Sequence, residues 1–266
     1  MENTVLLFSP GLDSFLGDWV LSKSAETDEK ITRIYFDINS RYSTYEVGFL
    51  KRWYPENFVK ILKGPDMSKL EDDSSYIPNR NAVLATLAQS YTNADRVLLN
   101  ATFDDRVSDG SIEFREHLSK TLSVSSGKKV IVDSLLKQYE KTTWVKKYID
   151  ENPNQILKVL EKTFSCYNVK LYNVVKFSYF RKTEKGYEEA GKINTMWGCM
   201  SCVACYRRLC SFILSNIYVP FNKIEIINKY IDSNIDEKLY PKRLETVREY
   251  YNFTNWYNNV FRKKYV

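Results

Sequence analysis

Short apolar segments alternate with amphipathic ones through about residue 135, and this alternation constrains the fold more than any other feature of the sequence. The apolar segments have the length of strands, and the segments that follow repeat their apolar residues at helical spacing. The predicted strands are Asn3–Phe8, Ile31–Ile38, Phe58–Leu62, Arg96–Ala101 and Lys129–Val132. Because strands separated by helices pair in parallel, the sequence predicts an α/β fold with a doubly wound parallel sheet over residues 1–135.

Residues 136–266 have a different character. Helical periodicity extends to about residue 163, and the chain after Cys205 is again helical and rich in aromatic residues. Between these parts, Val169–Phe180 alternates like one strand of a hairpin. We therefore expect a mostly helical C-terminal appendage to the first domain, with an inserted β-hairpin over about residues 168–196.

The composition is that of a folded chain, because 44% of the 266 residues are hydrophobic, which excludes a disordered protein. No apolar run reaches the roughly 18–20 residues that cross a bilayer, and no basic-then-apolar leader precedes a cleavage site. We therefore expect a soluble, cytoplasmic protein without a membrane partner. Lys and Arg exceed Asp and Glu by 39 to 33, and this diffuse net charge of +6 gives no ground for a nucleic-acid partner. His117 is the only histidine, which excludes a His-rich metal centre.

The first predicted strand leads into Ser9-Pro10-Gly11-Leu12-Asp13-Ser14, directly before an amphipathic helix. In a doubly wound sheet this turn is the usual phosphate site, since the helix directs free N–H groups and its positive dipole end at the ligand. Gly11 lets the backbone approach an anion, while Ser9 and Ser14 offer hydroxyl groups. The alternative is an ordinary turn in which Asp13 or Ser14 caps the helix.

This turn resembles the S-G-G-x-D-S loop of the N-type ATP pyrophosphatases, or PP-loop superfamily, which cleave ATP between its α and β phosphates. The resemblance implies that Ser9, Gly11 and Ser14 hold pyrophosphate, while Asp13 places Mg²⁺ or orders the loop. Pro10 replaces a glycine of that loop and supplies no N–H. The ATP-binding residues that the resemblance implies are Phe8, Ser9, Pro10, Gly11, Leu12, Asp13, Ser14 and Phe36.

Later segments resemble, in the same order, those of the 7-cyano-7-deazaguanine synthases, or QueC-like enzymes, which belong to this superfamily. These segments are Phe36–Arg41, Tyr76–Asn81, Leu99–Phe114, Thr163–Tyr167 and Gly198–Arg208. Taken singly, the charged residues in them are also compatible with solvated loops or a first helical turn. The substrate-binding or catalytic residues that the resemblance implies are Arg41, Arg80, Asn81, Asp104, Asp105, Asp109, Glu113 and Lys141.

The resemblance also implies a reaction. An ATP-dependent carbon–nitrogen ligase of this type uses ATP with Mg²⁺ to adenylate 7-carboxy-7-deazaguanine. Ammonia then gives the amide, and a second activation gives 7-cyano-7-deazaguanine (preQ0), a step of queuosine biosynthesis. An enzyme that stops at the amide shares every motif, and Pro10 leaves open a non-catalytic nucleotide-binding relative. A related pyrophosphatase that thiolates tRNA is the third alternative, although the sequence shows neither an extra RNA-binding domain nor a reactive cysteine outside the zinc set. A homodimer is the expected assembly.

All five cysteines lie in the C-terminal region, and Cys199, Cys202 and Cys205 form a C-x2-C-x2-C cluster. Zn²⁺ takes four soft ligands in a tetrahedron, and turns of this spacing bring thiolates under one metal ion. The family pattern implies Cys166 as the fourth ligand, which requires that the 32 intervening residues fold back as a hairpin. Cys210 is the alternative, although its apolar helical surroundings are typical of a core residue. We predict one structural zinc on Cys166, Cys199, Cys202 and Cys205, with an iron–sulfur cluster as the alternative.

Overall fold

The protein is described by a computed structural model, which covers residues 2–24, 29–73, 75–105, 108–167, 174–196, 198–199, 202–220 and 241–261. The chain forms two compact units, of which the first comprises Met1–Trp144 with Lys162–Phe164 and the second Val145–Glu161 with Ser165–Val266. The domain boundary expected near residue 135 stays a prediction. Within the described part of the chain, every helix is too short or too polar to span a membrane.

The first unit is built on a five-stranded sheet with the strand order β3-β2-β1-β4-β5. Its strands are β1 (Asn3–Leu7), β2 (Lys30–Asp37), β3 (Lys60–Lys63), β4 (Arg96–Leu98) and β5 (Ile131–Asp133). All neighbouring strands are parallel, and the chain passes from β3 at one edge to β4 beyond the central β1. The predicted doubly wound α/β fold is confirmed. The carboxyl end of β1 lies at the switch point of the strand order, where sheets of this kind bind ligands.

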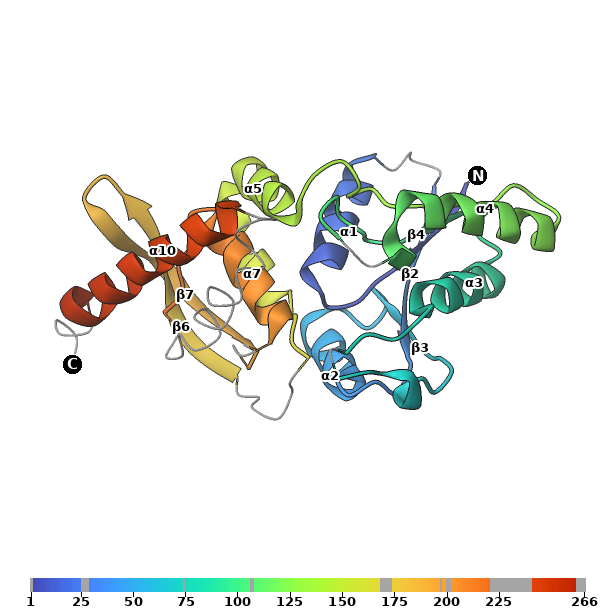
Figure 1. Cartoon of the computed structure of the whole chain (residues 1–266), viewed down its shortest axis with the longest axis horizontal. Helices are drawn as coiled ribbons and strands as arrows, with labels where there is room; N and C mark the ends of the chain where they lie inside the picture. Colours follow the sequence, from blue (N-terminus) through green and yellow to red (C-terminus); the bar gives the residue numbers. More distant parts are fainter. Residues whose placement is uncertain are drawn as a thin grey trace. The chain divides into compact units, whose positions relative to one another are not determined.

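Four helices cover the two faces of this sheet. Figure 1 shows α1 (Leu12–Ser24) and α2 (Ser43–Trp53) on one face, and α3 (Arg80–Thr92) and α4 (Ile112–Ser126) on the other. Behind α3 and α4, a continuous apolar core joins the inner strands to the helices, as the predicted periodicity requires. The buried residues of this core include Val5, Ile34, Val97, Ala85 and Leu122.

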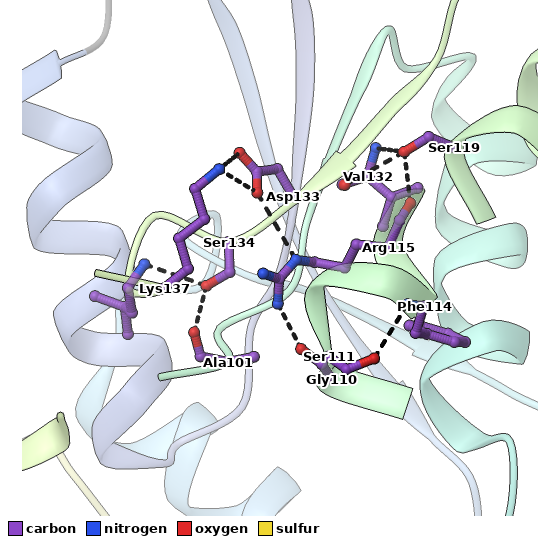
Figure 2. A network of polar contacts seen from close by, with 11 residues as sticks. Ala101, Gly110, Ser111, Phe114, Arg115, Ser119, Val132, Asp133, Ser134 and Lys137 are labelled. Atoms are coloured by element: carbon purple, nitrogen blue, oxygen red, sulfur yellow. Dashed lines mark hydrogen bonds and ion pairs between the residues drawn. The ribbon is translucent and has the colours of Figure 1, made fainter. Parts of the chain in front are cut away.

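Side-chain hydroxyl groups hold α4 against the edge strand β5. Ser111 caps the helix with its side-chain oxygen. Further along α4, Ser119 accepts a hydrogen bond from the Val132 amide at 2.8 Å (Figure 2), and Ser123 accepts one from the Val130 amide at 2.9 Å. These serines satisfy backbone groups that an edge strand otherwise leaves to water.

The second unit combines helices with one antiparallel hairpin, and α5 begins in the first unit and ends in the second. The main elements among its described residues are α5 (Lys141–Glu151), α6 (Ile156–Glu161), β6 (Val174–Thr183), β7 (Gly186–Met196), α7 (Val203–Ile213) and α10 (Pro241–Trp256). The hairpin occupies the chain between Cys166 and Cys199. It therefore allows these two cysteines to approach each other, although that it is an insertion into the family pattern stays a prediction.

Aromatic packing anchors the hairpin on α10. The ring of Phe180, which is fully buried, lies 5.5 Å from the ring of Phe253, centroid to centroid. Beside it, Glu249 of α10 accepts a hydrogen bond from the Tyr187 hydroxyl at 2.6 Å and forms an ion pair with Lys182 at 2.7 Å. The hairpin is thus held on α10 by buried aromatic packing and by polar contacts beside it.

Candidate functional site

The loop between β1 and α1 is curled by its own side chains. The Ser9 amide donates to the Ser14 hydroxyl at 2.9 Å, the two serine hydroxyls are 3.1 Å apart, and the Gly11 amide donates to the Ser9 hydroxyl at 3.2 Å. Helix α1 begins directly afterwards, at Leu12. The first amides of a helix have no partner within it, so this turn has an arrangement that can hold an anion.

Neighbouring segments fix this loop from behind. The Pro10 carbonyl accepts a hydrogen bond from the Phe164 amide at 2.7 Å. On the other side, the Asn100 side-chain amide donates to the Leu7 carbonyl at 2.6 Å and to the Ser14 hydroxyl at 3.3 Å. Asn100 was not among the predicted ATP-binding residues. It lies just after β4, next to β1 in the sheet, so only the strand order brings it to the loop.

Three of the predicted ATP-binding residues have large apolar side chains that are buried. Phe8 is 2% exposed and packs edge-on against Tyr54, with ring centroids 5.3 Å apart. Leu12 is also buried, and Phe36 belongs to the apolar core behind α3 and α4. These side chains support the site from the interior. Their contribution to ATP binding stays a prediction.

A lysine and three carboxylates lie beside the loop Ser9–Ser14, which we call the phosphate loop because of its predicted role. The Lys141 ammonium lies 2.8 Å from the Asp13 carboxylate. Asp104 accepts hydrogen bonds at its Oδ1 from the Lys141 amide at 3.0 Å and from the Thr102 hydroxyl at 2.8 Å, which fixes the start of α5. Asp105 follows directly in the chain. Four of the predicted site residues thus lie at the carboxyl ends of β1 and β4.

The electrostatics of this cluster are dominated by its acids. Burial raises the pKa of the Asp13 carboxyl, and the charges of Asp105 and Asp104 add to that rise against the opposing effect of Lys141. Burial lowers the pKa of Lys141, but the carboxylate of Asp13, with those of Asp105 and Asp104, prevails and holds that pKa above its usual value. The cluster therefore carries excess negative charge, which suits a bound cation next to a phosphate group.

Asn81 donates two hydrogen bonds to Asp109. The Asn81 amide donates to Oδ2 of Asp109 at 3.1 Å, and the Asn81 side chain donates to the Asp109 carbonyl at 3.1 Å. Asp109 is only 5% exposed, and its other carboxylate oxygen is buried without a hydrogen-bond partner among the described residues. The pair ties the start of α3 to the loop that follows β4, and so fixes the adjacent Arg80.

Arg80 is oriented by Tyr42, which directly precedes α2, and lies near Glu46 within α2. Its Nη1 donates to the Tyr42 hydroxyl at 3.3 Å. Glu46 lies nearby and accepts a hydrogen bond from the Tyr35 hydroxyl at 2.8 Å. Burial raises the pKa of Glu46 to about 7, although the Tyr35 hydroxyl and the charge of Arg80 both act to lower it. Sequence reasoning did not count Tyr35, Tyr42 or Glu46 among the site residues.

Two predicted site residues point elsewhere. Arg41 pairs with Glu71 at 3.0 Å through its Nε and also donates to the Asp72 carbonyl. Glu113 has a side chain that is 87% exposed and lies 4.0 Å from His117, one turn along α4. The structure does not bring either residue to the Lys141 cluster. A role for them in substrate binding stays a prediction.

A buried arginine braces the loop that carries the acids (Figure 2). Arg115 is 4% exposed, donates from Nη1 to the Gly110 carbonyl, and places its Nε 3.7 Å from Asp133 at the end of β5. Ser134 donates to the Ala101 carbonyl at 2.7 Å. The two ends of the loop are thereby fastened to β5. Sequence reasoning missed Arg115, although a charged residue between the apolar core residues of α4 was the available signal.

The four predicted cysteine ligands lie together in the second unit. The sulfur atoms of Cys166, Cys199, Cys202 and Cys205 are all within 4.8 Å of one another, and among the described residues this is the metal-ligating group that forms. In a zinc–thiolate tetrahedron with bonds of about 2.3 Å, sulfur atoms stand somewhat under 4 Å apart. The four residues therefore fit a metal ion. Cys210 is buried in α7 and is not part of the cluster.

The backbone around the cysteines is adapted to this cluster. The Cys199 amide donates to the Cys166 sulfur at 3.2 Å. A Cβ atom at Gly198 would lie 2.4 Å from the Cys205 sulfur and 3.0 Å from Cβ of Cys166, so only glycine fits there. Hydrogen bonds with Cys166 and Cys205 lower the pKa of Cys202 to about 6, against the opposing effect of Cys199. Hydrogen bonds with the neighbouring thiols raise the pKa values of Cys166 and Cys205, so Cys202 is the thiol of these three that most readily becomes a thiolate.

The fold and the site define a class of protein: a parallel α/β unit with a serine- and glycine-containing loop after its first strand, joined to a unit with four cysteines that could hold a metal ion. Residues 56–216 match the family described as "Queuosine biosynthesis protein QueC". This match spans more than half of the chain, and the chain therefore belongs to the QueC family. The resemblance seen in the sequence is confirmed.

Comparison with individual proteins adds the following. No curated protein sequence matches significantly. Among solved structures, the chain is similar to the U34-tRNA thiolase NcsA from Methanococcus maripaludis with its 4Fe-4S cluster, at 14% identity and a TM-score of 0.41, over 96% of this chain and 72% of that chain. It is also similar to a "predicted subunit of tRNA methyltransferase" from Methanocaldococcus jannaschii, at 15% identity and a TM-score of 0.37, over 54% of this chain and 73% of that chain.

Proposed function

We propose that this protein is an ATP-dependent ligase that converts 7-carboxy-7-deazaguanine and ammonia into 7-cyano-7-deazaguanine. Membership of the QueC family supports a role in queuosine biosynthesis. The observation that carries the proposal is the Lys141–Asp13 ion pair at 2.8 Å beside the curled serine loop, because it combines an anion-binding turn with cation-binding acids. Such a pairing is what a Mg²⁺–nucleotide complex requires.

The proposed chemistry begins with the substrate carboxylate. One carboxylate oxygen attacks the α phosphorus of ATP, the bond to the β phosphate breaks, and pyrophosphate leaves. Ammonia then attacks the carbonyl carbon, AMP leaves with its electron pair, and loss of a proton gives the amide. The amide oxygen then attacks the α phosphorus of a second ATP, its bond to the β phosphate breaks, and a second pyrophosphate leaves. Departure of AMP with its electron pair and loss of two protons from nitrogen give the nitrile. Positioning and charge stabilisation are the work of the protein in each step.

The site residues have distinct proposed roles. The loop of Ser9, Gly11 and Ser14 holds the leaving pyrophosphate, and Lys141 adds a positive charge at that end. The carboxylates of Asp13 and Asp109 offer oxygen ligands to Mg²⁺. Arg80 pairs with the substrate carboxylate, because a guanidinium matches both oxygens of a carboxylate. Arg41 forms an ion pair with Glu71 in this structure, so it can contact the substrate only after this ion pair has broken.

Product analysis tests this function. The purified protein is incubated with 7-carboxy-7-deazaguanine, ammonium and ATP-Mg²⁺, and the products are separated and weighed by mass spectrometry. We expect the nitrile together with AMP and pyrophosphate. Accumulation of the amide alone would show an enzyme that stops after the first activation, and ATP binding without AMP formation would show a non-catalytic relative. Light scattering on the same sample tests the proposed homodimer.

We also propose that the four-cysteine centre holds one structural zinc ion. Four iron atoms and four sulfides need more room than one ion, so the cysteine sulfurs of a cubic cluster stand further apart than those around a single zinc. The sulfur separations of at most 4.8 Å support the single ion. A zinc with four protein ligands has no open position, and its role would be to hold together the chain segments on either side of the hairpin.

Elemental analysis of purified variants tests the metal and its ligands. Replacing Cys166 by Ser removes one thiolate, so we expect zinc to fall well below one ion per chain and the melting temperature to drop. Cys210→Ser is the matched control, since it changes a buried cysteine outside the cluster and should retain zinc. Stoichiometric iron and sulfide with a visible charge-transfer band would contradict zinc.

A further inference from the structure

Two large aromatic side chains are exposed beside the Lys141 cluster. Phe103 is 69% exposed and Tyr139 is 39% exposed, and both lie in loops at the carboxyl edge of the sheet. The functional roles described above use neither of them. Exposed aromatic rings that gather next to a polar site are candidates for ligand contact, whereas single exposed apolar residues elsewhere need no explanation.

Backbone contacts place the two aromatics next to each other and next to the charges. The Phe103 amide donates to the Tyr139 carbonyl at 3.0 Å. The next residue, Asp104, accepts from the Lys141 amide at 3.0 Å, and Lys141 pairs with Asp13 of the phosphate loop at 2.8 Å. The two short segments therefore run side by side from the aromatic residues to the phosphate loop.

The Tyr139 ring is supported by two further aromatic side chains. Tyr139 packs edge-on against Trp144 with ring centroids 5.2 Å apart, and Trp144 is 7% exposed and donates from its indole nitrogen to the Leu136 carbonyl at 2.9 Å. Trp144 in turn lies edge-on to Trp19 of α1, at 6.5 Å. A ring bound against Tyr139 would therefore meet a packed surface, which lowers the entropy cost of binding.

The charges on the same loop select the kind of ring. Asp104 and Asp105 follow Phe103 directly, and ionised carboxylates only accept hydrogen bonds. The pyrimidine edge of a guanine-type ring presents two adjacent N–H donors, at the ring nitrogen and the exocyclic amine. The corresponding edge of adenine presents one donor and one acceptor, which a carboxylate matches less well. The loop therefore suits a guanine-type ring better than the adenine of ATP.

We propose that Phe103, with Tyr139 beside it, is the stacking platform for the deazaguanine ring of the substrate, with the Asp104–Asp105 carboxylates at the ring's donor edge. This inference rests on the proposed function and adds to it the residues that select the substrate. Lys141 contacts both Asp104 of the platform and Asp13 of the phosphate loop. The substrate and ATP would therefore lie on adjacent parts of one edge of the first unit.

Calorimetric binding of separate ligands tests the platform. The probes are 7-carboxy-7-deazaguanine, guanine, and a non-hydrolysable ATP analogue with Mg²⁺. Because stacking of a base on an aromatic side chain contributes about an order of magnitude in affinity, Phe103→Ala should raise the Kd of both ring probes roughly ten-fold. The Kd of the ATP analogue should stay within about two-fold. Phe103→Tyr should keep the ring affinity, whereas Phe103→Leu, which retains apolar area without a π face, should lose it.

Controls separate the possible failures. Most of the Phe103 side chain is exposed, so its replacement should leave the melting temperature unchanged, and Val124→Ala, at a side chain that is 84% exposed on α4, should change no affinity. A Phe103→Ala protein that binds both ring probes like the wild type, or that loses ATP affinity instead, overturns the platform. Phe103-dependent guanine binding without formation of amide or nitrile supports the platform and rejects the proposed function.

Discussion

The ammonium group of Lys141 lies 2.8 Å from the carboxylate of Asp13, and this pair joins the first turn of α5 to the first turn of α1. Asp13 belongs to the phosphate loop, whereas Lys141 comes after the last strand of the sheet. Lys141 interacts with three acids, since Asp104 and Asp105 raise its pKa together with Asp13. The pair therefore sets the charge at the end of the loop where the phosphates of a nucleotide would lie.

Replacing Lys141 by Ala should greatly reduce AMP formation. The variant leaves the acids of the cluster without their partner, which repels the phosphates, and removes a positive charge from the leaving pyrophosphate. Removing one such stabilising group typically lowers kcat by about 10²–10³-fold. Steady-state pyrophosphate release measures the effect. Lys137→Ala is the matched control, because Lys137 pairs with Asp133 at 2.7 Å in a more exposed place. An equal loss in both variants would contradict the assigned role.

The sheet could be predicted because its signals are local. Each strand of the first unit is a short apolar segment followed by a polar turn, and every predicted strand overlaps an observed one. Their ends differ by a few residues: the fourth strand was expected over Arg96–Ala101 and is observed as Arg96–Leu98. Ala101 instead accepts a hydrogen bond from Ser134, so its carbonyl is held by the neighbouring loop and not by a strand. Tertiary contacts of this kind have no signature in the local sequence.

The site was only partly predictable, for a related reason. Motif spacing identified the serine loop, because its residues are consecutive in the sequence. It also identified the four cysteines, because cysteine is a rare residue in this chain. Asn100 and Glu46 act through contacts that exist only after the sheet has formed, at Ser14 and Tyr35. Phe103 lies in a segment that resembles the family but was not among the predicted site residues, and only its exposure beside Lys141 indicates a role for it.

Glu46 should make the stability of the protein depend on pH. Burial raises the pKa of Glu46 from 4.5 to about 7 in the folded state, so the folded protein holds this proton more tightly than the unfolded chain does. The associated stability is present in full below pH 4.5 and is lost as the pH rises through 7. Chemical denaturation between pH 4 and pH 8 measures the slope. Glu46→Gln should be more stable than the wild type at pH 8, by on the order of 1–3 kcal/mol, and nearly equal to it at pH 4.

Two further variants check this assignment. Tyr35→Phe removes a hydroxyl that lowers the pKa of Glu46, so the loss of stability should move to higher pH. Glu113→Gln changes a glutamate whose side chain is 87% exposed and should leave the pH profile of stability unchanged. A Glu46→Gln protein with the same pH profile as the wild type would show that Glu46 is not the group responsible.

Gly198 should be required for metal binding. A methyl group at this position would lie 2.4 Å from the Cys205 sulfur, so Gly198→Ala must displace either that sulfur or the Cys166 segment. We expect zinc content and melting temperature both to fall, with a loss of metal affinity of about ten-fold or more, as for other residues that support metal ligands. Gly48→Ala is the matched control, since a Cβ there meets no atom within 4 Å and alanine favours the helix. Full metal retention in Gly198→Ala would refute the crowding argument.

Pro10 should limit the affinity of the loop for ATP. The Ser9 and Gly11 amides already donate to serine hydroxyls within the loop, so the missing N–H of Pro10 removes a donor that the loop cannot readily replace. Pro10→Gly restores that N–H and keeps the carbonyl that accepts from Phe164 at 2.7 Å. A hydrogen bond to a charged group contributes about 1.5–3 kcal/mol, whereas the added flexibility of glycine costs about 1 kcal/mol. The first effect is larger, so ATP should bind more tightly in calorimetry. Pro10→Ala, which also has an N–H but less flexibility, should gain at least as much, and weaker ATP binding by both variants would show that proline rigidity matters more than the donor.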